Sequence, residues 1–120
     1  MLKRFSNVTV WSQDLNNLLP FYRDTLGLKV AMQDERFVAF GESEDEPGLC
    51  LGSHSEVKGK ASDPYRHMVG FVSDDLDADY RRLTSAGVEF IEQPTEYGGM
   101  RIATMKDPEG NLVQLFQPTK

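Results

Sequence analysis

The sequence predicts an α+β fold of two tandem βαβββ modules whose strands form a cup-shaped mixed sheet. The first observation is an internal repeat, because "VTVWSQDL" at residues 8–15 realigns with "VGFVSDDL" at residues 69–76. The second is that a helical pattern and then three strand-like runs follow each copy. A four-stranded sheet with helices on one face leaves its other face uncovered, so we expect two such units to combine around a cup.

Apolar spacing predicts one amphipathic helix in each module. Asp14 and Asp75 are the expected N-caps, and Gly27 and Gly87 stand where a left-handed residue ends a helix. Pro20 removes one backbone donor, so the first helix is expected to begin late or to bend there. The predicted buried stripes recur three or four residues apart and comprise Leu15, Leu18, Leu19, Tyr22 and Leu26, then Leu76, Tyr80 and Leu83.

Strand-like runs follow each helix, and they set the predicted module boundaries. Residues 53–65 are polar and carry Gly and Pro, which is typical of a linker. We therefore expect one domain over residues 1–120, with module one at about 1–53, a linker at 54–65 and module two at about 66–120. The predicted strands lie at residues 28–33, 36–42 and 48–53 in the first module and at 88–93, 101–106 and 111–117 in the second.

Composition narrows the classes of partner and compartment. A chain of 120 residues with 39% hydrophobic and 27% charged residues is typical of one globular domain. The net charge of −6 and the scattered Lys and Arg residues argue against nucleic-acid binding, and no apolar run approaches the length of a membrane span. Cys50 is the only cysteine, so an intrachain disulfide is impossible and a reducing cytoplasm is the expected location.

Three segments carry a resemblance to a known family. They are "FYRDTLGLKV" after the first strand, "VGFVSDDLDADYRRLTSAGVEF", and "DPEGNLVQLFQP" near the end. Together they resemble the vicinal oxygen chelate superfamily, which contains glyoxalase, bleomycin-resistance proteins and extradiol dioxygenases. The resemblance implies paired βαβββ modules around a U-shaped cup, a frequent homodimer, and a site on the concave face. In the metal enzymes of that family the ligands come from the first and last strands of each module.

The four positions that match those ligand slots are poor metal ligands. They are Asn7, Cys50, Met68 and Gln114, which include no carboxylate and no imidazole. We therefore expect no metal and no other cofactor. His67 would enter the third slot if the strand shifted by one residue, but that shift would turn Val69 and Phe71 off the helix-packing face, so we prefer Met68. His67 is then a strand-edge residue partly in water, and His54 is expected to be solvated.

Strand parity places Asn7, Thr9 and Trp11 on the concave face, and it assigns Val8 and Val10 to the helix-facing core. The Trp11 ring either contacts a ligand or only packs. Asn7 and Gln114 hydrogen-bond either a ligand or each other.

Three other residues invite a chemical interpretation. Cys50 is predicted to be a small buried hydrophobe, because no histidine falls on its face to form a thiolate pair. Arg101 follows a Gly-Gly loop and either closes over an anionic ligand or lies on the surface. Asp107 belongs to "DPEGN", which is explained as a turn. No catalytic residue is predicted; the expected ligand-binding set is Asn7, Thr9, Trp11, Cys50, Met68, Arg101 and Gln114.

Three functions of different classes follow. The first is a protein of the bleomycin-resistance type that binds a small molecule without a metal, either to sequester it or to act on it. The second is a metal-dependent lyase or dioxygenase of the glyoxalase type, which would use His67 and Gln114 with ligands from a partner subunit. The third is a regulatory or structural subunit. A homodimer with a small-molecule ligand, and with no nucleic-acid or membrane partner, is the expected assembly.

Overall fold

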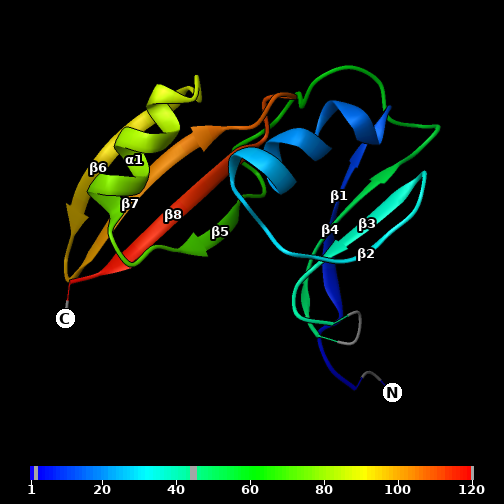
Figure 1. Cartoon of the computed structure of the whole chain (residues 1–120), viewed down its shortest axis with the longest axis horizontal. Coiled ribbons are helices and arrows are strands. Elements are labelled where there is room, and N and C mark those ends of the chain that lie inside the picture. The colour runs from blue at the N-terminus through cyan, green and yellow to red at the C-terminus, as the bar shows by residue number, and fades with distance from the viewer. Residues whose placement is uncertain (2, 44–45, 120) are drawn as a thin grey trace. The chain divides into compact units, whose positions relative to one another are not determined.

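The computed structural model describes residues 1, 3–43 and 46–119. The chain divides into two compact units, Met1–Gly59 and Lys60–Lys120, and each contains one four-stranded sheet (Figure 1). This division falls inside the segment predicted as a linker. The α+β class and the two-module organisation are confirmed.

The first unit is a mixed sheet with two short helical segments. Its strand order is β1-β4-β3-β2, with β1 parallel to β4 and the other neighbours antiparallel. The elements are β1 (Asn7–Ser12), η1 (Leu15–Asn17), η2 (Pro20–Thr25), β2 (Val30–Gln33), β3 (Phe37–Phe40) and β4 (Gly48–Ser53).

The second unit repeats this topology. Its strand order is β5-β8-β7-β6, again with the first strand parallel to the last, so the repeat in the sequence corresponds to two copies of one supersecondary unit. Its elements are β5 (Val69–Val72), α1 (Leu76–Ser85), β6 (Phe90–Tyr97), β7 (Met100–Lys106) and β8 (Leu112–Pro118).

The predicted helix of the first module is not one continuous α-helix. η1 is a single 3₁₀ turn, and η2 is a π-helix in which the Leu26 N–H donates to the Phe21 carbonyl at 2.8 Å. Pro20 is the first residue of η2, where its missing N–H leaves no intrahelical bond unmade. The expected interruption at Pro20 is therefore confirmed. Gly27 and Gly87 have φ values of 78° and 93°, as predicted for the residues that follow the helices.

Equivalent hydrogen bonds fasten the helical segment of each module to its last strand. The Leu15 N–H donates to Ser53 Oγ at 2.8 Å, and the Leu76 N–H donates to Gln117 Oε1 at 2.9 Å. The predicted N-caps are also present, because the side chain of Asp14 accepts from the Asn16 N–H and that of Asp75 accepts from the Ala78 N–H.

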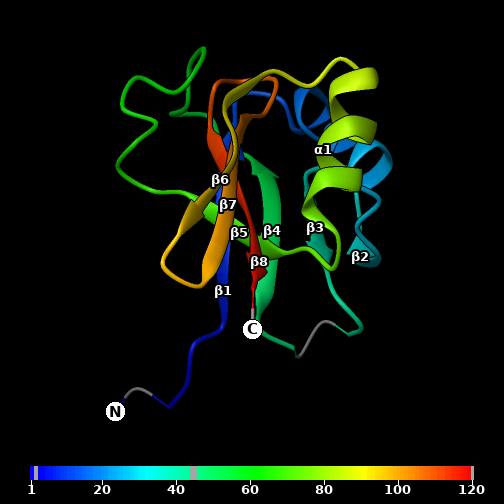
Figure 2. The same ribbon diagram turned by 90° about the vertical axis from the view of Figure 1, so that its left-hand side faces the viewer.

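Each sheet buries one face under its helical segments. Figure 2 shows α1 on one side of the second sheet, where Tyr80 packs against Phe90 with ring centroids 4.7 Å apart. We call the opposite face of each sheet its open face. The open face of the first sheet carries Thr9, Trp11, Phe37 and Cys50, and that of the second carries Glu92, Thr104, Gln114 and Phe116. Fully buried core residues include Leu15, Leu18, Tyr22, Val38, Leu51, Leu76, Leu83, Met105, Leu112 and Val113.

One predicted part of the core is wrong. Val8 shares the covered face with Leu49, as parity requires, but its side chain is 46% exposed, and Val10 is only half-buried. β1 is an edge strand of its sheet, and helical segments that pack over the centre of a sheet bury the side chains of its edge strands less completely. Val38 and Leu51 are fully buried and form the covered core of this sheet instead.

Among the described residues, no helix is long and apolar enough to cross a membrane.

Candidate functional site

An aromatic ring lies directly on the open face of the first sheet. Trp11 pairs with Gly52 across β1 and β4, and Phe37 pairs with the same glycine from β3. A Cβ at Gly52 would lie 2.5 Å from Cζ3 of Trp11 and 3.1 Å from Cδ1 of Phe37. The absence of a side chain at Gly52 is therefore what allows both rings to approach the sheet.

Two rings hold Trp11 in place while leaving part of it accessible. Its ring centroid is 6.1 Å from that of Phe37 and 5.4 Å from that of His54, and the His54 ring meets it edge-on at 76°. His54 is exposed, as expected, but it also accepts a hydrogen bond at Nδ1 from the Glu56 N–H at 3.1 Å and so is not simply solvated. Trp11 remains 43% exposed.

A small polar cluster adjoins this aromatic surface. Asn7 Nδ2 donates to Thr9 Oγ1 at 2.6 Å, and the side chains of Asn7 and Thr9 both hydrogen-bond the Cys50 thiol. Cys50 is only 7% exposed. Burial raises the pKa of the Cys50 thiol above its ordinary value, and the bonds to Asn7 and Thr9 offset part of that rise. The structure thus brings Asn7, Thr9 and Cys50 together in one group.

We expect the Cys50 thiol to react slowly with alkylating agents in the native protein. A raised pKa leaves less thiolate at a given pH, and the thiolate is the nucleophile. Timed iodoacetamide labelling at mildly alkaline pH, followed by mass spectrometry, should show modification far slower than that of urea-unfolded protein. The difference should shrink as pH rises through the native pKa. Equal labelling rates in the two states would contradict the burial of this thiol.

The donor set does not fit a divalent metal. Cys50 is favoured as the neutral thiol, whereas metals bind the thiolate, and Asn7 can offer a metal only its neutral amide oxygen, because its Nδ2 group is a donor. Met68 and Gln114 add a thioether and an amide, which are weak ligands for Zn, Ni, Mn or Fe(II). Within residues 1, 3–43 and 46–119, no three His, Cys, Asp or Glu side chains group closely enough to share a metal ion.

The open face of the second sheet contains a row of polar side chains on β6, β7 and β8, which ends at a glycine on β5. Glu92 pairs with Thr104, Thr104 with Gln114, and Gln114 with Gly70. A Cβ at Gly70 would lie 2.5 Å from Cε2 of Phe116, so here too an aromatic ring lies over a glycine. The two sheets therefore share one design, a glycine covered by a ring beside polar side chains.

The register of β5 agrees with the preferred alternative at Met68. Val69 and Phe71 pair with the buried Val113 and Leu115 on the covered face, and Gly70 lies on the open face. Met68 precedes the strand and is half-buried, whereas His67 is exposed.

Arg101 does not belong to the candidate site. Its guanidinium binds both carboxylate oxygens of Asp77 in α1, at 3.0 and 3.1 Å, which raises the pKa of Arg101 and lowers that of Asp77. It therefore lies on the covered face of the second sheet, whereas Gln114 lies on the open face. Parity along "RIATMK" distinguishes Arg101 from Thr104, and this is the signal that could have excluded it.

Glu92, Tyr97 and Thr104 also lie on this face and were not predicted from the sequence. The Tyr97 hydroxyl hydrogen-bonds Glu92 Oε2, and Thr104 Oγ1 lies 3.4 Å from Glu92 Oε1. Simple alternation would place Glu92 and Tyr97 on opposite faces, but the pairing of β6 with β7 is irregular between Phe90 and Glu92 and again between Glu92 and Thr95. Pro94 inside the strand was the available signal, because proline within a strand marks an edge or a bulge.

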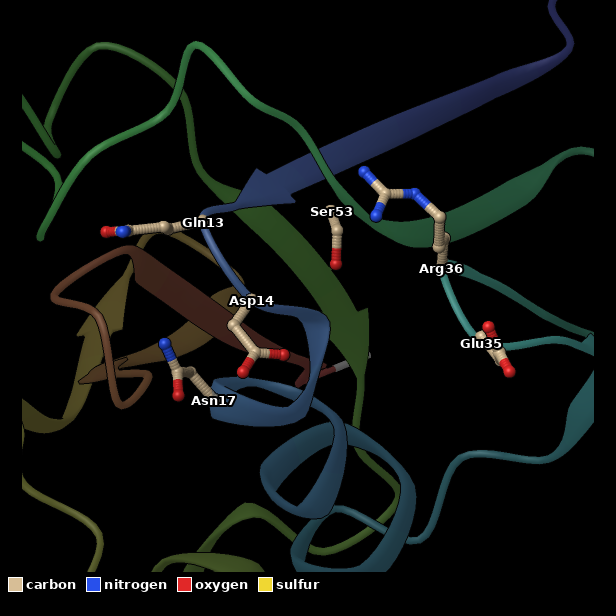
Figure 3. A pocket seen from close by; sticks show the side chains of 6 residues that line it. All are labelled: Gln13, Asp14, Asn17, Glu35, Arg36 and Ser53. Atoms are coloured by element: carbon tan, nitrogen blue, oxygen red, sulfur yellow. The ribbon is translucent and has the colours of Figure 1, made fainter.

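A separate polar hollow of about 670 Å³ lies at one end of the first sheet (Figure 3). Two of its members have structural roles, since Asp14 caps η1 and Ser53 accepts the Leu15 N–H. A hollow of this composition suits water or a small polar solute better than a planar apolar molecule. Its lining residues are Gln13, Asp14, Asn17, Glu35, Arg36 and Ser53.

Known proteins are similar to this chain over nearly its whole length, in sequence or in structure. The Bacillus subtilis (strain 168) protein YwbC is 26% identical over 130 aligned positions, covering 98% of this chain and 99% of YwbC. A glyoxalase/dioxygenase from Nostoc punctiforme is 17% identical, covers 98% of this chain and 92% of its own, and has a TM-score of 0.78. TnmS3, an antibiotic binding protein from Streptomyces sp. CB03234, is 23% identical, covers 98% and 97% of the two chains, and has a TM-score of 0.76.

The model of one protein family matches residues 4–115, which include the first strand, both helical regions and most of the last strand. The resemblance inferred from the three sequence segments is confirmed by this match. The chain belongs to the Glyoxalase/Bleomycin resistance protein/Dioxygenase superfamily.

Proposed function

We propose that this protein binds a planar, largely apolar small molecule on the open face of the first sheet, without a metal ion. The observation that carries the proposal is Trp11, whose ring is held by Phe37 and His54 against Gly52 and yet remains 43% exposed. Leaving so large an apolar ring in water forgoes the free energy that its burial would provide. A planar ligand stacked on the ring would recover it, and aromatic walls are typical of small-molecule sites.

The neighbouring groups favour binding over covalent chemistry. Asn7 and Thr9 offer amide and hydroxyl groups that can orient a ligand, and the raised pKa of Cys50 disfavours a thiolate nucleophile. Sequestration is therefore the proposed activity. The antibiotic-binding name of TnmS3, a protein of the same fold, is compatible with this proposal.

Calorimetric titration with acridine, a planar and uncharged ring system at mildly alkaline pH, tests the proposal. The native protein should bind acridine, and Trp11→Ala should weaken binding about tenfold, because stacking contributes on the order of 0.5 to 1.5 kcal/mol beyond burial. Asn7→Ala should weaken it less. The control is Tyr65→Ala, which removes an exposed aromatic ring in the loop before β5. If native protein and Trp11→Ala bound acridine with equal affinity, the proposal would be contradicted.

The metal-dependent alternative makes opposite predictions. A glyoxalase-type lyase would turn over the hemithioacetal of glutathione and lose that activity with a chelator. We expect no turnover, with or without added Ni, Zn or Mn. A purely structural subunit would show neither turnover nor stabilisation by acridine, whereas a binding protein should melt at higher temperature when acridine is present.

We further propose a homodimer. Each four-stranded sheet has two edge strands, β1 and β2 in the first and β5 and β6 in the second, and exposed edges favour association. Light scattering should give about twice the 13.6 kDa chain mass across micromolar concentrations. A constant monomer mass over that range would refute this assembly.

A further inference from the structure

We propose that His54 sets the specificity of the Trp11 surface, because its Nε2–H group donates a hydrogen bond to an acceptor in the plane of the stacked ligand. The ligand class is then a planar ring system that carries a ketone oxygen or an unprotonated ring nitrogen at its edge. The inference rests on the proposed small-molecule function and specifies the chemistry of the ligand. Every residue that it uses lies in the first unit, Met1–Gly59.

Three hydrogen bonds fix His54 at the end of β1. Its backbone N–H donates to the Ser12 carbonyl at 2.9 Å, its carbonyl accepts from the Val57 N–H at 3.1 Å, and its Nδ1 accepts from the Glu56 N–H at 3.1 Å. The first bond continues the pairing of β1 with β4, and the second closes the turn that follows β4. An exposed side chain held in this way loses less conformational entropy when it binds a ligand.

The bond from Glu56 also determines which ring nitrogen of His54 carries the proton. A nitrogen that accepts an N–H hydrogen bond has no proton of its own, so the proton of the imidazole is on Nε2. This Nε2–H group has no hydrogen-bond partner within residues 1, 3–43 and 46–119, and the side chain is exposed. His54 therefore offers a ligand one donor of defined position.

The imidazole borders the stacking surface without covering it. Its centroid is 5.4 Å from that of Trp11, and the two ring planes are inclined at 76°. A ring at that inclination cannot join a parallel stack on the indole, so it stands beside a molecule that lies flat there. Ketone oxygens and ring nitrogens have their lone pairs in the molecular plane, where a neighbouring N–H can reach them.

The other polar groups of this surface already bond to one another. Asn7 Nδ2 donates to Thr9 Oγ1 at 2.6 Å, and both side chains hydrogen-bond the Cys50 thiol. This cluster lies toward the start of β1, whereas His54 adjoins Ser12 at its end. The two ends of the surface therefore differ, and the donor that is not already engaged is at the His54 end.

His54 could instead serve only to hold the Trp11 ring by contact. Two substitutions separate these roles. His54→Phe keeps an aromatic ring beside Trp11 and removes the donor, whereas His54→Gln removes the ring and keeps a side-chain N–H donor. A contact role predicts that His54→Gln weakens every planar ligand equally and that His54→Phe does not. A donor role predicts that His54→Phe alone loses the preference for a ligand with an acceptor.

The experiment compares 9-fluorenone with fluorene by equilibrium dialysis on the full chain. Both probes are planar and uncharged, and they differ in having a ketone or a methylene group at one position. The quantity compared is the ratio of the association constant of fluorenone to that of fluorene, because the difference in hydrophobicity between the probes is the same for every variant. His54→Phe should lower this ratio about fivefold, the effect of one neutral hydrogen bond.

Two further variants complete the design. His54→Gln should retain most of the native ratio. The matched control is His67→Phe, which makes the same change at the other histidine of the chain, also exposed, and should leave the ratio unchanged.

Three outcomes would overturn the inference. The ratio could be unchanged in His54→Phe, it could fall as far in His54→Gln as in His54→Phe, or it could fall as far in His67→Phe. If both probes still bind native protein and weaken with Trp11→Ala, the proposed function stands and only the role of His54 fails. If neither probe binds native protein, both proposals fail.

Discussion

Replacing Gly52 with alanine is expected to reduce acridine affinity about tenfold or more and to shift the emission of Trp11. The new methyl group would lie 2.5 Å from Cζ3 and 2.8 Å from Cε3 of the indole, well inside contact distance. The ring is partly exposed and can swing away from the sheet, which removes the stacking surface. Overpacking of this kind also costs about 1 to 3 kcal/mol of stability.

Trp11 is the only tryptophan, so its emission reports on this surface directly. Native protein and Gly52→Ala should differ in emission maximum, with the variant closer to that of an indole in water. Cys50→Ala is the matched control, because it changes the same strand on the same open face two residues away. It should leave the emission maximum in place. An unchanged spectrum and affinity in Gly52→Ala would show that the ring does not depend on this glycine.

Asp107→Ala is expected to destabilise the protein by about 3 kcal/mol, since charge-assisted hydrogen bonds are each worth roughly 1.5 to 3 kcal/mol and their donors would be left unpaired. Asp107 is 4% exposed, and its carboxylate accepts from the Glu109 and Asn111 N–H groups and from Asn111 Nδ2, each at 2.9 Å. These bonds shape the turn between β7 and β8, in which the Gly110 N–H also donates a hydrogen bond to the Asp107 carbonyl at 3.0 Å. The prediction that "DPEGN" is a turn is confirmed.

Urea unfolding measures this effect. Asp107→Asn should be intermediate, because its amide oxygen can still accept the two backbone N–H groups that share Oδ1, whereas its NH₂ group would face the donor Asn111 Nδ2. Asp63→Ala is the control, since its ion pair with Arg66 lies on an exposed surface and such pairs contribute little. A loss below about 0.5 kcal/mol in Asp107→Ala would place it among ordinary surface substitutions and contradict the structural role of this carboxylate.

The repeat made much of the fold predictable. Its copies placed Asp14 and Asp75 at helix starts and Gly27 and Gly87 at helix ends, and the structure has all four in those roles. These features are local, because a cap or a left-handed glycine depends on a few neighbouring residues. The exposure of Val8 was not predictable in the same way, because it depends on which strand forms the edge of the sheet.

The candidate site was predictable only where strands alternate regularly. Thr9, Trp11 and Cys50 share one face because β1 and β4 pair without interruption. In β6 the irregular pairing brings Glu92 and Tyr97 onto one face, which alternation forbids. The contact between the His54 and Trp11 rings was also not predictable, because the loop after β4 has no regular alternation from which a side-chain direction could be inferred.

The most direct test of a metal-free binding site is a calorimetric titration of acridine into chelator-treated protein, repeated after adding back Ni, Zn, Mn or Fe(II). We predict the same dissociation constant in both titrations and no retained metal after dialysis, because the thiol of Cys50 and the amides of Asn7 and Gln114 are weak ligands. Binding that appears only after metal is restored, with about one ion retained per chain, would contradict the account.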